Sequence, residues 1–130
     1  MTTTAVTAPL LRLALRLDAV VTGVNGLAYL LLADPINDLL GLAVPLQRGV
    51  GVFLLVYGVA VWLLAVPRTV NRGAVAAVVA LNAVWAVASV AELALGGLGT
   101  TTLGAVWVVA QALVVGGFAA LQYVALRRER

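Results

Sequence analysis

Histidine, cysteine and lysine are absent from this 130-residue chain, and charged residues of any kind make up only 10% of it. Without histidine or cysteine, the chain lacks the usual protein ligands of haem, zinc, copper and iron–sulfur clusters. It can form no disulfide and offers no thiol nucleophile. All eight basic residues are arginine, so no lysine can form a Schiff base with retinal or pyridoxal phosphate. We therefore expect no cofactor and no bound metal.

The shortage of charge also indicates the class of protein. A soluble domain needs about a quarter of its residues charged to cover its surface, whereas hydrophobic residues make up 64% of this chain. Its outer surface must therefore face lipid. Long apolar stretches that can cross a hydrocarbon core of about 30 Å predict an all-α membrane protein, a bundle of four antiparallel transmembrane helices. We place the spans at about 10–33, 49–66, 74–95 and 103–126.

Prolines, glycines and polar residues mark the segments outside these spans. Asp34 and Pro35 stop the first span, and together they resemble the cap and first residue of a new helix. We expect a short interfacial helix over residues 34–42, and Pro45 then ends the connector. The other segments are a flexible N-terminus (1–9), a tight loop (67–73), a glycine-rich turn (96–99) and a basic tail (127–130).

The arginines are distributed unevenly between the two sides of the expected membrane. Only Arg48 lies on the side of the first connector, together with Asp34 and Asp38. The positive-inside rule therefore predicts a plasma-membrane protein with both termini in the cytoplasm. The arginines on the side of the termini are Arg12, Arg16, Arg68, Arg72, Arg127, Arg128 and Arg130.

Polar side chains form a stripe on the first span, where Asp18, Thr22, Asn25 and Tyr29 recur at helical spacing. Hydrocarbon cannot satisfy polar groups, so this stripe must face protein or water. The third and fourth spans carry similar stripes, which predicts a bundle with a partly polar interior. These stripes hold Asn82, Trp85, Ser89 and Glu92 on the third span, and Trp107, Gln111, Phe118 and Gln122 on the fourth.

A polar interior of this kind predicts a binding or transport-type module for a small or amphipathic molecule. A carboxylic acid inside such a bundle can bind a cation or carry protons. Asp18 would stand at the inner mouth of the site. The other expected ligand contacts are Asn25, Asn82, Trp85, Glu92, Trp107 and Gln111.

Simpler interpretations of the same residues remain open. Asn25, Asn82 and Gln111 can hydrogen-bond one another between helices, at about 0.6 kcal/mol each. The tryptophans can serve as anchors at the membrane interface instead of ligand walls.

The acids also have simpler interpretations. Asp18 can be an interfacial acid paired with Arg16 or Arg72, if the hydrocarbon begins after it. Glu92, one turn from the end of its span, can face water or pair with Arg48.

Two other function classes were weighed against the binding module. Gly51 and Gly58 share one face of the second span, and small residues let helices approach closely. A structural subunit packing through this face, on a second copy or another membrane protein, is the main alternative. Tyr57 points the other way, so we expect only one of the two faces to look into the bundle. An enzyme using Asp/Glu acid–base chemistry on a lipid-soluble substrate is less favoured, because no nucleophile–base pair or phosphate-binding loop is visible.

The run LLRLALRLDAVVTGVNGLAYLLL, a proline-containing connector and then RGVGVFLLVYG follow one after another in this chain. This layout resembles small four-helix DoxX-like membrane proteins, and it is similar to uncharacterised actinobacterial proteins of the same size. The residues that carry the resemblance are Arg12, Gly23, Gly26 and Gly58. The lysine after the first-helix glycine and the acid of the second helix are missing here, so no catalytic residue is carried over.

Overall fold

The computed structural model describes residues 5–6, 9–67 and 69–128, and within them the chain forms five helices and two short strands. The all-α prediction is confirmed. Four of the helices are long and apolar enough to cross a membrane, the architecture of a multi-pass membrane protein. The elements are β1 (Ala5–Val6), α1 (Pro9–Leu31), α2 (Ala33–Leu40), α3 (Val44–Leu64), β2 (Val70–Asn71), α4 (Arg72–Ala94) and α5 (Thr102–Arg128).

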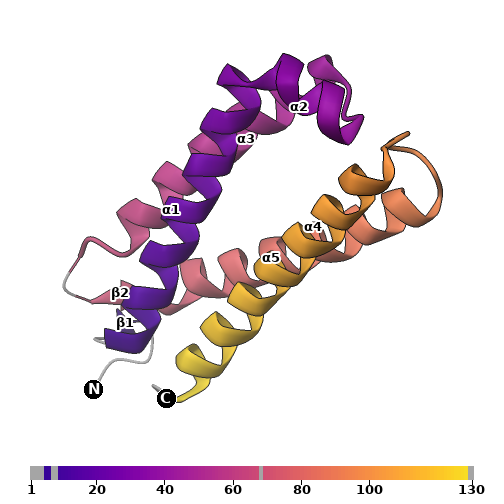
Figure 1. The fold of residues 1–130 in the computed structure, drawn as a ribbon. Coiled ribbons are helices and arrows are strands. Elements are labelled where there is room, and N and C mark those ends of the chain that lie inside the picture. The colour runs from indigo at the N-terminus through magenta and orange to yellow at the C-terminus, as the bar shows by residue number, and fades with distance from the viewer. Residues whose placement is uncertain (1–4, 7–8, 68, 129–130) are drawn as a thin grey trace.

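The four long helices form two hairpins, α1 with α3 and α4 with α5 (Figure 1). Both chain termini lie at one end of the bundle, which we call the terminal end, and α2 lies at the other, the distal end. Strand β1 pairs antiparallel with β2 and so ties the N-terminal segment to the connection between the hairpins. Residues 1–4 and 7–8 of the expected flexible N-terminus, with Arg68 and residues 129–130, lie outside the described residues.

Two helix starts differ from the sequence-based expectation. Helix α2 begins at Ala33 with Leu32 at its N-cap, so Asp34 lies inside the first turn and caps nothing with its side chain. Helix α3 begins at Val44 and takes Pro45 into its first turn. A proline fits there because the first N–H groups of a helix have no intrahelical acceptor. Pro45 therefore starts α3, about one turn before the predicted span, and does not end the connector.

Glycines bring α1 and α3 into backbone contact. A Cβ added to Gly26 would lie 2.8 Å from the carbonyl oxygen of Gly51, and one on Gly58 would lie 3.0 Å from that of Ala19. The glycine face expected to receive a partner is therefore buried inside the chain. Tyr57, on the next face of α3, reaches α4. The expectation that only one face of this helix looks inward is wrong, because α3 contacts α1 with one and α4 with the other.

The terminal end holds the two hairpins together through a hydrophobic cluster contributed by all four long helices, including Leu11, Val61 and Val75. Arginine side chains beside this cluster donate hydrogen bonds to backbone carbonyls at or just after the helix ends. Arg12 donates to the carbonyl oxygens of Ala65 and Pro67 after α3, and Arg72 donates to that of Leu126 in α5. The Ala65 and Leu126 carbonyls lie at the C-terminal ends of helices, where no intrahelical donor is available. Arg12 thus joins α1 to the end of α3, and Arg72 joins α4 to α5, so each arginine closes one hairpin where the charge gathers.

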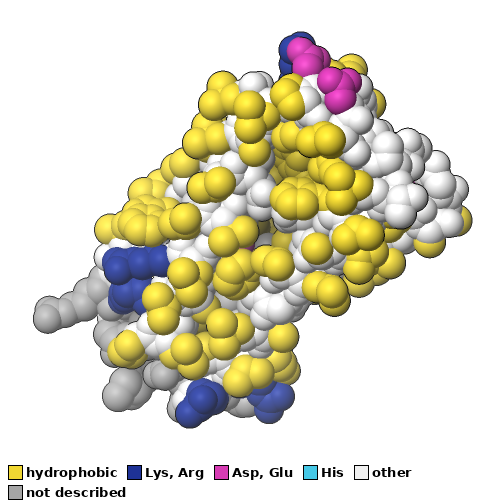
Figure 2. Space-filling model, viewed as in Figure 1, with side chains coloured by type: hydrophobic (Ala, Val, Ile, Leu, Met, Phe, Trp, Pro, Cys, Tyr) yellow, Lys and Arg dark blue, Asp and Glu magenta, His cyan; other side chains and the backbone are white. Residues whose placement is uncertain are grey.

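At the distal end of the bundle, α2 contacts the beginning of α5. The Thr101 amide donates to the Leu40 carbonyl oxygen, which also lies only 1.9 Å from a Cβ added to Gly104. Figure 2 shows the charge distribution that results: dark-blue side chains mainly at the terminal end, acidic ones at the distal end, and mostly hydrophobic and uncharged surface between. An apolar band flanked by charge is typical of a protein surrounded by lipid.

Candidate functional site

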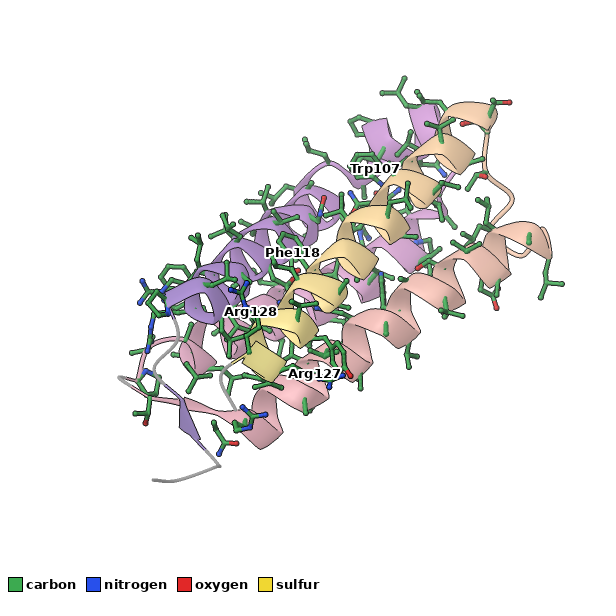
Figure 3. The ribbon with its side chains drawn as sticks, turned by 90° about the horizontal axis from the view of Figure 1, so that it is seen from below. Trp107, Phe118, Arg127 and Arg128 are labelled. Carbon is green, nitrogen blue, oxygen red and sulfur yellow. The ribbon has the colours of Figure 1, made fainter. Side chains whose placement is uncertain are left out.

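A cavity of about 340 Å³ lies between the two hairpins. This volume falls within the range of about 300–1,000 Å³ that is usual for small-molecule sites. All four long helices contribute to its wall, which is mainly apolar and includes Val21, Leu54 and Phe118. Figure 3 shows Trp107 and Phe118 along α5, and both residues line the cavity. The site is therefore an apolar chamber inside the bundle, with polar groups at defined points.

Five of the seven expected ligand contacts line this cavity, namely Asn25, Trp85, Glu92, Trp107 and Gln111. Glu92 is exposed and supplies the only carboxylate of the wall. Asp18 and Asn82 are not part of the lining. They lie nearer the terminal end of the bundle, in a separate buried cluster.

One wall is built by polar contacts between α1 and α5. Asn25 and Gln111 donate to each other's amide oxygens at 3.3 and 3.4 Å, which confirms the expected pairing of these two amides. One turn further, the Trp107 indole N–H donates to the Tyr29 hydroxyl at 3.0 Å. Each primary amide carries two N–H groups and an oxygen that can accept twice. The reciprocal pair therefore leaves hydrogen-bonding capacity for a molecule in the cavity.

Gln47 also lines the cavity, although it was not among the expected ligand contacts. Its side-chain N–H₂ donates to the carbonyl oxygens of Ala33 and Leu42 at 2.9 and 2.8 Å. Its Oε1 is buried and has no hydrogen-bond partner among the described residues. A buried acceptor without a donor costs free energy, so each such atom calls for a partner. Gln47 was missed because the second span was placed from residue 49 onward.

Trp85 belongs to a row of stacked aromatic rings from α3 and α4. Phe53 stacks on both Tyr57 and Trp85, with ring centroids 5.7 and 5.6 Å apart. Trp85 is half-buried and forms part of the cavity wall. For this tryptophan the structure favours a wall of the chamber over an anchor at the membrane interface.

The separate cluster surrounds Asp18, whose side chain is only 1% exposed. Its Oδ1 accepts from the Thr22 hydroxyl at 2.9 Å. Its Oδ2 accepts from the side-chain amides of Asn82 and Gln122, both at 2.8 Å. The expected pairing of Asp18 with Arg16 or Arg72 is wrong, because hairpin packing surrounds this buried carboxyl group with hydroxyl and amide donors.

Further hydrogen bonds extend the Asp18 cluster to α3. Asn82 also donates to the Gln122 amide oxygen at 3.2 Å. The Tyr57 hydroxyl donates to Asn82 Oδ1 at 3.0 Å and reaches the Val78 carbonyl oxygen at 3.3 Å. Asp18, Tyr57, Asn82 and Gln122 thus join one residue from each of the four long helices.

The arginines expected near Asp18 are engaged elsewhere. The Arg16 guanidinium lies over the Trp62 ring, 5.4 Å from its centroid, and Arg72 bonds the Leu126 carbonyl. Searches of protein-family models, of curated proteins and of solved structures find no match to this chain. The geometry of the cavity and of the Asp18 cluster therefore carries the functional argument alone.

Proposed function

We propose that this protein is a membrane binding module of the transport type, whose inter-hairpin cavity takes a small amphipathic molecule. The observation that carries the proposal is a cavity of about 340 Å³ at the depth of the membrane spans, walled by all four helices. An apolar wall with a few convergent polar groups is the usual make-up of a ligand site. The apolar part of the ligand would contact Val21, Leu54 and Phe118.

The polar part of the ligand would bind at the amides that project into the chamber. Asn25 and Gln111 offer remaining donors and acceptors, and the unpartnered Gln47 oxygen favours a ligand that carries a hydroxyl or N–H group. Glu92 is the only charged group in the wall, so an anionic ligand is disfavoured. A structural role through Gly51 and Gly58 is not proposed, because both glycines face α1.

The same proposal includes the location of the protein. The arginine bias supports insertion in a bacterial plasma membrane with both termini in the cytoplasm, and the helix layout supports a DoxX-like relationship. Association with a second copy or with another membrane protein stays a prediction. The cavity does not require it, since one chain supplies every wall.

The test is native mass spectrometry of the protein released from its own membrane in mild detergent. Ala88→Phe fills the cavity, and Ala83→Phe adds the same side chain to an exposed position outside its lining, as the matched control. We expect the wild type and Ala83→Phe to retain an additional mass that Ala88→Phe loses. Bare subunits in every preparation, or an additional mass that survives Ala88→Phe, would contradict a ligand in this cavity.

A further inference from the structure

Asp18, Asn82 and Gln122 lie outside the cavity lining, and the proposed function makes no use of them. We propose that Asp18 is a proton-binding site that gains and loses one proton inside the folded bundle. The side-chain amides around it rotate, so that the polar groups are hydrogen-bonded in both protonation states. The reaction is a simple transfer, in which the carboxylate takes a proton from hydronium and leaves water. This inference goes beyond ligand binding and does not depend on it.

The first observation is that the hydrogen-bond partners of Asp18 within the described part of the chain are all neutral. Its donors are a hydroxyl (Thr22) and two primary amides (Asn82 and Gln122). An arginine partner would hold the carboxyl group ionised, and a wholly apolar pocket would hold it neutral. A shell of neutral groups that can both donate and accept can hydrogen-bond either state.

The titratable groups around Asp18 are few. Among the described residues, α3 contributes Tyr57, which joins the cluster through Asn82, whereas the α4 and α5 partners are amides. On α1 itself, Arg16 lies over Trp62. Arg12 and Arg72 bond backbone carbonyls at the terminal end. Among the residues that the structure describes, no cation therefore directly contacts the carboxylate.

The hydrogen bonds in the structure are those of the ionised state of Asp18. Both Asp18 oxygens accept, Oδ1 from Thr22 and Oδ2 from Asn82 and Gln122. Asn82 also donates to the Gln122 amide oxygen, and the Tyr57 hydroxyl donates to Asn82 Oδ1 at 3.0 Å.

The protonated state follows if the two amides each rotate by half a turn, which exchanges their nitrogen and oxygen positions. A proton on Asp18 Oδ2 then lies between Gln122 Oε1 and Asn82 Oδ1, which take the two positions 2.8 Å away, and both oxygens accept it in a three-centre hydrogen bond. Gln122 in turn donates to Asn82 Oδ1, and Asn82 donates to the Tyr57 oxygen across the present 3.2 and 3.0 Å separations. The Tyr57 hydroxyl then donates its hydrogen bond to the Val78 carbonyl oxygen, which lies 3.3 Å away.

All these polar groups therefore keep a partner in both states without movement of the helices. The Val78 carbonyl is essential to this result, because it gives Tyr57 an acceptor once Asn82 has turned. Thr22 continues to donate to Oδ1 in either state. Since Thr22 also lines the cavity, Asp18 lies one side chain away from a space large enough for water.

Infrared difference spectroscopy of the protein in phosphatidylcholine vesicles, recorded across a pH series, tests this inference without any cavity ligand. The chain has three aspartates, and Asp34 and Asp38 are exposed. A double variant, Asp34→Asn with Asp38→Asn, therefore leaves Asp18 as the sole aspartate. Carbon-13 labelling of aspartate then assigns any shifted carboxyl C=O band to Asp18.

We expect an isotope-shifted C=O band that appears and disappears reversibly with pH while the helical amide bands stay constant. Thr22→Val should move the band to higher frequency because Oδ1, the C=O oxygen of the protonated acid, loses its donor, and Thr22→Ser should restore it. Absence of the band at every pH at which the bundle stays folded, or a band that never changes with pH, would show a carboxyl group locked in one state and overturn the proposal. Because no ligand takes part, this result and the mass-spectrometric result can fail independently.

Discussion

Replacing Asn82 with leucine should destabilise the bundle more than any other single amide replacement along the polar stripes. The change removes the donor to Asp18 Oδ2 at 2.8 Å, the donor to Gln122 at 3.2 Å and the acceptor of Tyr57. A hydrogen bond to a charged group contributes about 1.5–3 kcal/mol, and neutral interhelical bonds contribute about 0.6 kcal/mol each. Because Tyr57 retains the Val78 carbonyl, we expect a loss of about 2–4 kcal/mol in the free energy of unfolding.

Asn25→Leu is the matched control, because it removes an amide of the same kind from α1. It breaks only the two long bonds to Gln111 and should cost roughly 1 kcal/mol. Unfolding by increasing dodecyl sulfate in mixed micelles, followed by tryptophan fluorescence, gives both values. Equal losses for the two variants, or a larger loss for Asn25→Leu, would refute the argument that a buried carboxylate depends on Asn82.

Two further predictions concern the distal end and the orientation. Gly104→Ala places a Cβ 1.9 Å from the Leu40 carbonyl oxygen, so hydrogen exchange in α2 should accelerate, whereas Gly117→Ala, with nothing within 4 Å, should leave it unchanged. Equal exchange in both would contradict this contact. The chain lacks cysteine, so Arg48→Cys should react with an impermeant maleimide on intact cells and Arg128→Cys only after permeabilisation. The reverse pattern would contradict cytoplasmic termini.

The sequence was sufficient to predict where the polar interior lies on the first helix. The stripe from Asp18 to Tyr29 repeats at helical spacing, and the structure buries Asp18 and Thr22 and half-buries Asn25 and Tyr29. Helical periodicity determines a face, because each residue advances by about 100° around the axis. Periodicity does not determine which residue of another helix is met, and the pairing of Asn82 with Asp18 was therefore not predicted.

The packing of α3 likewise could not be predicted from the sequence pattern. Gly51 and Gly58 were recognised as a close-contact face, but nothing in a single chain's pattern says whether such a face meets its own bundle or a partner. Gln47 was assigned to a connector because Pro45 can either end a segment or open a helix. Its buried, unpartnered oxygen became visible only once α3 was seen to begin at Val44.

By itself, the sequence determined the class of this protein, four apolar helices with charge at their ends, because the length and hydropathy of each span are local properties. It also determined which faces are polar. Only the tertiary structure decided the depth at which the hairpins meet, since the bonds of Asn82 and Gln122 to Asp18, and of Thr101 to Leu40, join the two hairpins. That register places Asp18 outside the cavity lining with Thr22 between the two, which no local pattern encodes.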